Sequence, residues 1–215
     1  MKQKEIFFGG ESDKWFERNR SLKDSPPDLV VDALHDMGIR PLSLLEIGAS
    51  DGRRLRRVKD EFNSSVSGIE PSEKAVATAK SRYNIDLHRA TADSLPFQDS
   101  SFDCVVMGFC LYLCDRGDLF RIALEADRVL SDQGLMVIYD FYADTPVKKA
   151  YHHLQGIWSY KMDYRQMFLW NPGYREIYYR AHQHSLSGLV TEVAADDRII
   201  VSILEKNLEN GYMER

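Results

Sequence analysis

The chain has 215 residues, 44% of them hydrophobic and 28% charged, with a formal net charge of −5 at pH 7. This length and composition suit a globular protein with a buried core and exclude a low-complexity or disordered chain. The acidic balance argues against a general nucleic-acid binder, and no apolar run could span a bilayer or serve as a secretory signal, so we expect a cytoplasmic protein.

The predicted elements alternate between helices and strands along most of the chain. A polar and aromatic first segment, containing Trp15, Arg18 and Asn19, precedes an amphipathic helix over residues 25–38 that Gly38 can end. Strands are then predicted at 42–48, 65–70, 85–90, 102–109 and 135–141. Further helices are predicted at 52–62, 72–83 and 117–130. Such alternation implies right-handed crossovers and a mostly parallel sheet covered on both faces.

The C-terminal third changes character. Residues 142–173 are rich in aromatic side chains and predict a partly helical insertion after the fifth strand. Residues 174–185 and 197–207 have a period of two and predict an antiparallel strand pair. We therefore expect one doubly wound α/β domain over residues 1–215. Its predicted parts are a cap segment and helix (1–40), a ligand-binding core (42–141), the insertion (142–173) and the terminal strands (174–207).

The stretch LLEIGASDGRRL, residues 44–55, places Gly48 and Gly52 directly after the first buried strand. In an open α/β sheet, ligands bind beyond the carboxyl ends of the strands, and glycines there let the backbone approach a ligand. The dinucleotide fingerprint G-x-G-x-x-G is not met, because residue 53 is Arg, and Asp51 would lie beside a pyrophosphate. A nicotinamide oxidoreductase is therefore disfavoured, and a nucleoside ligand without phosphate is favoured.

Four stretches in order resemble the class I S-adenosylmethionine-dependent methyltransferases, most closely the small-molecule branch typified by ubiquinone and menaquinone methyltransferases. They are EIGASDG, SGIEPS, ATADSLPFQDSSFDCVVMGFCLYL and ALEADRVLSDQGLMVIYDF, within residues 42–141. The resemblance implies a Rossmann-like seven-stranded sheet, S-adenosyl-L-methionine as the cofactor, and transfer of its methyl group. It also implies a cofactor site made of Glu46, Gly48, Ala49, Ser50, Asp51, Gly52, Glu70, Pro71, Thr91, Ala92, Asp93, Met107 and Gly108.

Physical reasons accompany this assignment. The two ribose hydroxyls are donors, so the carboxylate of Glu70 can accept from both. The chain departs from the family at three positions: Ser50 replaces a frequent glycine, Thr91 an adenine-binding aspartate, and Gln133 another glycine. These departures keep open an alternative, a catalytically silent partner subunit that binds an S-adenosyl ligand.

The acceptor of the methyl group is less well defined. A hydroxyl acceptor would benefit from a general base, and the candidates are Asp140, His152 and His153. Predicted acceptor-binding residues are Tyr139, Tyr142, Trp158 and Tyr164. We expect a small-molecule acceptor, a sugar or glycan intermediate or a phenolic metabolite, and a monomer or homodimer.

Other local patterns favour structural roles. The basic run 53–59 is typical of a solvated helix face rather than an RNA site. The three cysteines, Cys104, Cys110 and Cys114, lack zinc-type spacing and are expected to be buried free thiols. The pair His182 and His184 is too weak a signal for a metal site, so no metal is predicted.

Overall fold

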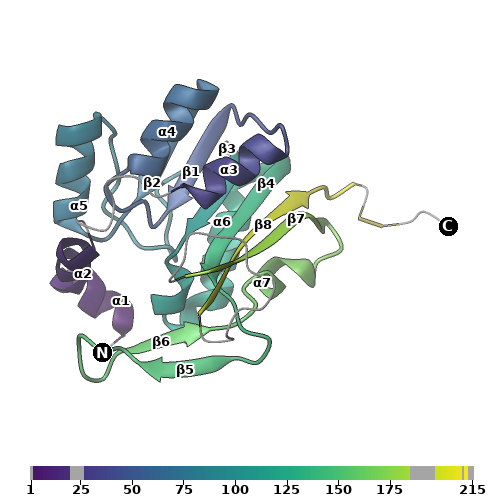
Figure 1. Cartoon of the computed structure of the whole chain (residues 1–215). Coiled ribbons are helices and arrows are strands. Elements are labelled where there is room, and N and C mark those ends of the chain that lie inside the picture. Colours follow the sequence, from purple (N-terminus) through teal and green to yellow (C-terminus); the bar gives the residue numbers. More distant parts are fainter. Residues whose placement is uncertain (1, 20–26, 185–196, 210, 213–215) are drawn as a thin grey trace.

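The structure, a computed structural model, describes residues 2–19, 27–184, 197–209 and 211–212. Its centre is a six-stranded sheet in the order β2-β1-β3-β4-β8-β7 (Figure 1). The strands are β1 (Ser43–Ile47), β2 (Ser65–Ile69), β3 (Phe102–Gly108), β4 (Leu130–Phe141), β7 (Tyr174–Gln183) and β8 (Arg198–Lys206). The first four are parallel, and β8 and β7 are added antiparallel, which confirms the predicted α/β class.

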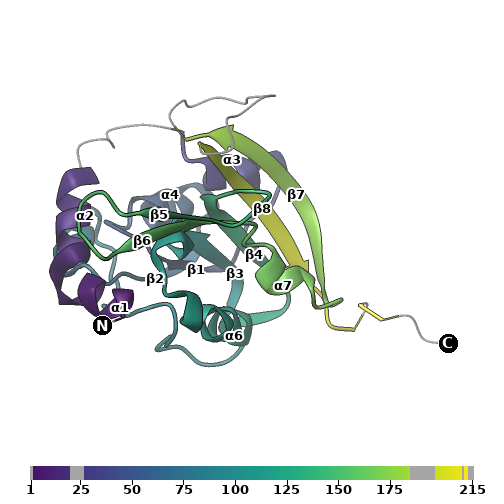
Figure 2. The same ribbon diagram turned by 90° about the horizontal axis from the view of Figure 1, so that it is seen from below.

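Helices cover both faces of the sheet (Figure 2). One face carries α3 (Leu29–Asp36), α4 (Arg53–Phe62), α5 (Glu73–Thr78) and its π-helical continuation η3 (Ala79–Tyr83). The other face carries α6 (Leu119–Val129) and α7 (Gln166–Leu169). Successive side chains of a strand point to opposite faces. Leu44 therefore packs in the core beneath α3 and α4, and Leu45 packs in the core beneath α6.

The strand count differs from the prediction of seven. Within the described residues, the predicted strand 85–90 forms only a single parallel bridge, between Ile69 and His88. Only Ile85 of this stretch is buried, whereas Asp86, His88 and Arg89 are exposed. A segment with so little apolar surface gains little from joining the sheet edge, so β2 is left as the outermost strand.

The predicted helical insertion is mainly a hairpin. β5 (Val147–Ala150) and β6 (Trp158–Lys161) pair antiparallel, and α7 is the one short helix between β6 and β7 in this described stretch. In β5 the half-buried Val147 and Lys149 alternate with the exposed Lys148 and Ala150. This period of two is obscured in the sequence because two of the four residues are lysines.

The N-terminal segment lies along the carboxyl edge of the sheet, next to the hairpin (Figure 1). It consists of α1 (Gln3–Ile6), η1 (Phe7–Glu11) and α2 (Ser12–Asn19). The Gln3 side chain exchanges two hydrogen bonds with the backbone of Trp158. Asp13 accepts a hydrogen bond from the Ser72 hydroxyl at 2.6 Å, which docks α2 beside α5. The segment is thus fixed from both sides.

The remaining expectations concern the start of the first predicted helix, the stretch between the last two strands, and membrane-spanning helices. The helix α3 begins after Asp28, whose carboxylate caps the backbone N–H groups of Val30 and Val31. The predicted start of this helix at residues 25 and 26, and most of the stretch between the last two strands, lie outside the described residues. Among the helices that are described, none has the length and apolarity needed to cross a membrane.

Candidate active site

A cavity of about 790 Å³ lies at the carboxyl ends of the parallel strands. Its walls come from the turn after β1, the end of β2, the loop at 90–93, the ends of β3 and β4, and the start of the chain segment after β7. The N-terminal segment contributes Lys4, Phe7, Ser12, Trp15 and Asn19. The volume is in the range of small-molecule and cofactor sites. The sheet edge therefore provides one continuous site for ligands.

The turn after β1 brings its backbone close to neighbouring groups. Gly48 and Gly52 have φ angles of 82° and 72°. A β-carbon on Gly48 would lie 2.8 Å from the Cys110 Cβ, and one on Gly108 would lie 2.5 Å from Glu46 Oε1. Such approaches exclude side chains at both positions, so the two strand ends form a narrow backbone cradle.

Glu70, at the end of β2, is held in a fixed orientation. Its Oε2 accepts a hydrogen bond from the Ser50 N–H at 2.9 Å, and its Oε1 accepts one from the Ser72 N–H at 2.9 Å. Carboxylate oxygens accept more than one hydrogen bond each. Glu70 therefore presents an oriented acceptor to the cavity that it lines.

Glu46 is a buried carboxylate on the cavity wall, 2% exposed. It pairs with Arg54, which also pairs with both oxygens of Asp28 at 2.8 and 3.0 Å. Burial raises the pKa of Glu46 to about 7 against the attraction of Arg54. Within the described residues, Glu46 Oε2 has no hydrogen-bond partner. A buried oxygen without a partner is costly, and a donor group on a ligand would relieve that cost.

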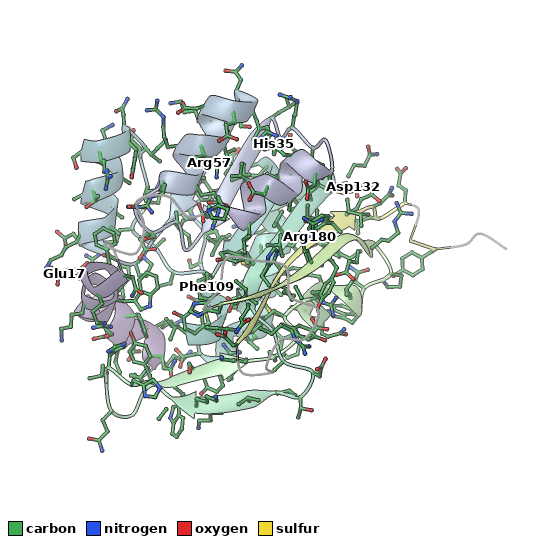
Figure 3. All side chains as sticks on the ribbon, in the orientation of Figure 1. Glu17, His35, Arg57, Phe109, Asp132 and Arg180 are labelled. Carbon is green, nitrogen blue, oxygen red and sulfur yellow. The ribbon has the colours of Figure 1, made fainter. Side chains whose placement is uncertain are left out.

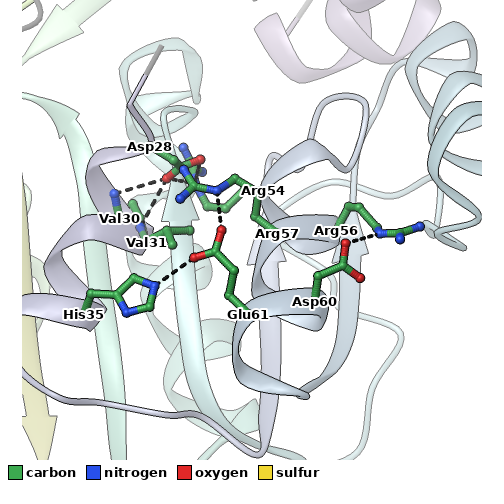
Figure 4. A network of polar contacts seen from close by, with 9 residues as sticks. All are labelled: Asp28, Val30, Val31, His35, Arg54, Arg56, Arg57, Asp60 and Glu61. Atoms are coloured by element: carbon green, nitrogen blue, oxygen red, sulfur yellow. Dashed lines mark hydrogen bonds and ion pairs between the residues drawn. The ribbon is translucent and has the colours of Figure 1, made fainter. Parts of the chain in front are cut away.

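The basic run of α4 is neutralised by carboxylates (Figure 4). Arg56 pairs with Asp60 at 2.5 Å, and Arg57 pairs with Glu61 at 2.8 Å. Arg54 differs from the predicted solvated face because it is turned inward. It precedes Val58 by four residues and so lies on the apolar stripe of α4, a signal that the sequence contains.

Residues 91–93 form another part of the cavity wall. Asp93 pairs with Lys4, which also lies 3.2 Å from Asp118. Burial opposes ionisation of Asp93, but hydrogen bonds from Lys4 and Thr91 hold its pKa below the ordinary value. The N-terminal segment is therefore tied by its lysine to the loop that lines the cavity, a contact that sequence patterns did not predict.

The structure brings most of the predicted site residues together. Those that line the cavity are Glu46, Gly48, Ala49, Ser50, Asp51, Glu70, Pro71, Thr91, Ala92, Asp93, Gly108 and Tyr139. Gly52 and Met107 lie behind the wall, where Gly52 N-caps α4 and Met107 is buried in the core.

The three predicted bases are not on the cavity wall. Asp140 is fully buried and accepts hydrogen bonds from the N–H groups of Leu111 and Phe141 at 2.8 and 2.7 Å. Burial raises its pKa to about 7. Side chains alternate along β4, so Tyr139 reaches the cavity and Asp140 instead anchors the loop after β3. His152 and His153 are exposed in the turn between β5 and β6.

Three predicted acceptor-binding residues also lie elsewhere. Tyr142 donates to Asp144 at 2.8 Å, and Trp158 packs under the Lys148 ammonium. Tyr164 is fully buried and donates to the Tyr160 carbonyl. Their placement follows from the hairpin, which replaces the expected helices.

Several cavity residues were missed or misjudged from sequence. Phe109, at the end of β3, and His184, after β7, both line the cavity. Cys110 and Cys114 line it as well and are only half-buried, whereas Cys104 is buried as predicted. Aromatic and sulfur side chains at strand ends resemble core residues in sequence, and only the position of the sheet edge distinguishes them.

Comparisons with known proteins agree with this geometry. Residues 44–134 match a family model described as a methyltransferase domain. A demethylmenaquinone methyltransferase of Tropheryma whipplei is 32% identical over 101 residues, 46% of this chain and 41% of the relative. The 27-O-demethylrifamycin SV methyltransferase of Amycolatopsis mediterranei is 32% identical over 139 residues, 59% of this chain and 49% of the relative. The chain thus spans about half, or less, of the length of these curated relatives.

A solved structure extends the likeness to nearly the whole fold. The 1,6-didemethyltoxoflavin-N1-methyltransferase of Burkholderia thailandensis, solved with 1,6-didemethyltoxoflavin and S-adenosylhomocysteine, superposes with a TM-score of 0.70. The two sequences are 16% identical, and the superposition covers 95% of this chain and 87% of the Burkholderia chain. The fold defines a Rossmann-like α/β protein of the methyltransferase type. The family match over residues 44–134 and the similarity to these methyltransferases support a class I S-adenosylmethionine-dependent methyltransferase, as the sequence resemblance predicted.

Proposed function

We propose that this protein transfers the methyl group of S-adenosylmethionine to a hydroxyl of a small molecule. The observation that carries the proposal is the cavity wall itself. It combines the backbone cradle at Gly48 and Gly108, the oriented carboxylate of Glu70 and the Glu46 Oε2, which has no partner among the residues that the structure describes. This donor and acceptor set fits the zwitterionic nucleoside cofactor of the class.

Each part of the cofactor has a complementary group. Glu46 would accept from the methionine ammonium, and Glu70 would accept from the ribose hydroxyls. Residues 91–93 would face the adenine, and the turn at 48–51 would hold the methionine end. The cofactor supplies a methyl group that its sulfonium already activates. The protein's task is to align the acceptor with it and to exclude water, to which the N-terminal segment contributes by covering the cavity.

The alternative of a silent partner subunit rests on the departures at residues 50, 91 and 133. Ser50 and Gln133 have φ angles of 50° and 60°, the left-handed region that glycine adopts without strain. At two of the three positions, residues 50 and 133, the backbone thus keeps a conformation typical of glycine although the residue is not glycine. Ser50 lines the cavity and Gln133 does not, so it is the conformation kept at Ser50 that supports a working site over a degenerate one.

The acceptor would lie beyond the cofactor, where Phe109, Tyr139, His184 and Ile199 line the cavity. We call this region the acceptor half. The proposed acceptor remains a small ring compound of one of the two predicted classes, a sugar or glycan intermediate or a phenolic metabolite. The relatives named above act on other molecules, demethylmenaquinone and 27-O-demethylrifamycin SV, by their names.

Calorimetric titration with S-adenosylhomocysteine tests the cofactor site. We expect wild-type protein to bind and Glu70→Ala to bind at least about tenfold more weakly, because hydrogen bonds to a charged group are lost. Glu73→Ala is the matched control, since Glu73 is exposed on the adjacent helix α5. Folded wild-type protein that fails to bind at millimolar ligand would refute the proposal.

A second measurement separates an enzyme from a silent binder. Wild-type protein that binds S-adenosylhomocysteine is incubated with methyl-labelled S-adenosylmethionine and panels of phenols and sugars. Transfer of label to any acceptor supports the enzyme. Tight cofactor binding with no transfer to either panel supports the partner subunit instead.

A further inference from the structure

Phe109 has a strained backbone at the edge of the acceptor half. Its φ angle is 59°, in the left-handed region that bulky side chains rarely occupy. Its N–H donates to the Tyr139 carbonyl at 2.8 Å, so the pairing of β3 with β4 enforces the conformation. Strain of this kind persists where the surrounding structure imposes it, and it gathers at ligand sites. The Phe109 ring is thereby directed to the cavity wall.

The Phe109 ring is the centre of an aromatic cluster. Its centroid lies 5.3 Å from Tyr112, 5.1 Å from Tyr139, 4.8 Å from Phe141 and 5.6 Å from His184. The rings of Phe109 and His184 are nearly parallel, at 9°. In the view of Figure 3, Phe109 lies between the N-terminal helices and the β7–β8 pair. The acceptor half is thus bordered by flat π surfaces, which favour planar ligands.

His184 adds a proton acceptor to these rings. Its side chain is 49% exposed, and its Nδ1 lies 3.9 Å from Asp197 Oδ1. Partial burial and the Lys161 ammonium, opposed by Asp197, lower the pKa of His184 below its ordinary value. The imidazole is therefore neutral at neutral pH, the state in which it can accept a proton. Asp197 is close enough to stabilise the imidazolium that would form.

We propose, building on the function proposed above, that the acceptor is a planar aromatic compound with a hydroxyl group, stacked on the Phe109–His184 pair, and that His184 takes the hydroxyl proton. The O–H bond breaks and its proton moves to the imidazole. The oxygen electron pair forms the bond to the methyl carbon. The carbon–sulfur bond breaks with its electrons kept on sulfur, which leaves S-adenosylhomocysteine, and the imidazolium returns its proton to water.

The test uses 7-hydroxycoumarin, a planar phenol whose fluorescence distinguishes its neutral and ionised forms. It is titrated into protein saturated with S-adenosylhomocysteine. We expect binding to wild type and at least about tenfold weaker binding to Phe109→Leu, which keeps an apolar side chain but removes the π face. Phe120→Leu is the control, because Phe120 is 88% exposed on α6.

The proton step has its own readout. We expect the bound phenol to ionise at a lower pH in wild type than in His184→Gln, because the neutral imidazole accepts its proton. His153→Gln, in the exposed turn between β5 and β6, should leave this midpoint unchanged. His184→Gln should also abolish the fall of methyl transfer to the phenol below neutral pH while S-adenosylhomocysteine affinity stays constant.

The failures of the two proposals can be told apart. Failure of folded wild-type protein to bind S-adenosylhomocysteine refutes the methyltransferase function. Intact cofactor binding overturns the acceptor inference under any of three results: no phenol binding at millimolar probe, equal phenol binding by Phe109→Leu, or tighter binding of methyl glucoside than of the phenol. An unchanged ionisation midpoint in His184→Gln removes the proton role of that residue.

Discussion

At the scale of single residues, the proposed cofactor site includes a close contact between Glu46 and Gly108. The carboxylate of Glu46 packs directly over the Gly108 backbone, where a β-carbon would lie 2.5 Å from Oε1. The same carboxylate pairs with Arg54 from the side. Its position is therefore set by the absence of a side chain on β3 as much as by its ion pair.

We expect Gly108→Ala to displace the Glu46 carboxylate. The added methyl group should cost ~1–3 kcal/mol of unfolding free energy through overpacking and weaken S-adenosylhomocysteine binding by about tenfold or more. Gly117→Ala is the control, since a β-carbon there meets nothing within 4 Å. Thermal unfolding and calorimetry report the two effects. Unchanged affinity in Gly108→Ala would remove Glu46 from the proposed cofactor contacts.

At the scale of elements, the N-terminal segment closes one side of the cavity through polar contacts. The N–H groups of Gln3 and Lys4 donate to the Asp115 carboxylate at 3.0 and 2.9 Å. The Lys4 ammonium pairs with Asp93 and Asp118. These contacts attach α1 to the loop before β3, through Asp93, and to the loop after β3, through Asp115 and Asp118. The N-terminal segment is therefore bound directly to the cavity wall.

Lys4→Met should weaken the attachment of the N-terminal segment to the cavity wall, while keeping the apolar stem of the side chain. We expect faster amide hydrogen exchange in α1 and several-fold weaker S-adenosylhomocysteine binding. The effect stays near ~1 kcal/mol, because the Lys4 side chain is 31% exposed and its ion pairs are screened. Lys14→Met, on the exposed side of α2, is the control. Equal exchange in both variants would show that the Lys4 contacts do not hold the segment down.

At the scale of the whole molecule, the buried carboxyl of Asp140 couples stability to pH. Its pKa is raised to about 7 in the native state, from an ordinary value of 3.8. Between about pH 4 and pH 7 the unfolded chain has lost a proton that the native state keeps. The contribution of Asp140 to stability therefore falls as the pH rises through this window and is largest at its acid end.

This slope can be measured by denaturant unfolding of wild type and Asp140→Asn across that window. Each unit of pH should reduce the wild-type free energy of unfolding by up to ~1.4 kcal/mol relative to the variant, which cannot titrate at this position. Asp132→Asn, at an exposed site of the same strand, is the control for the same chemical change at the protein surface. A difference between wild type and Asp140→Asn that stays constant with pH would contradict the prediction.

Structural features that depend on neighbouring residues in the sequence, such as buried strands and the turns after them, could be predicted along the whole chain. Apolar runs that end in glycine place buried parallel strands and their ligand-binding edge, and the Gly48–Gly52 turn, Glu70 and residues 91–93 all reach the cavity. The hairpin β5–β6 was mistaken for helices because its lysines obscure a short alternation. A seventh strand was predicted because residues 85–90 contain three apolar side chains, but only Ile85 is buried and the stretch forms a single bridge.

The acceptor half could not be predicted because its parts meet only through the order of the strands. Phe109 and His184 are distant in sequence, and β4 and β8 lie between their strands in the sheet, yet their ring centroids are only 5.6 Å apart. Asp140 was preferred to Tyr139 as a reacting group because sequence alone does not show which face of β4 points to the cavity. A shift of one residue along β4 reverses which of the two side chains faces the cavity.

Asp93 belongs at once to the cavity wall and to the attachment of the N-terminal segment. Binding equilibria that share a group are linked, and the linkage is reciprocal. If a ligand in the cavity strengthens the Lys4–Asp93 contact by some factor, then formation of that contact strengthens ligand binding by the same factor. Under that condition, a change in the N-terminal segment that alters the Lys4–Asp93 contact would also alter the affinity of the cavity for its ligand.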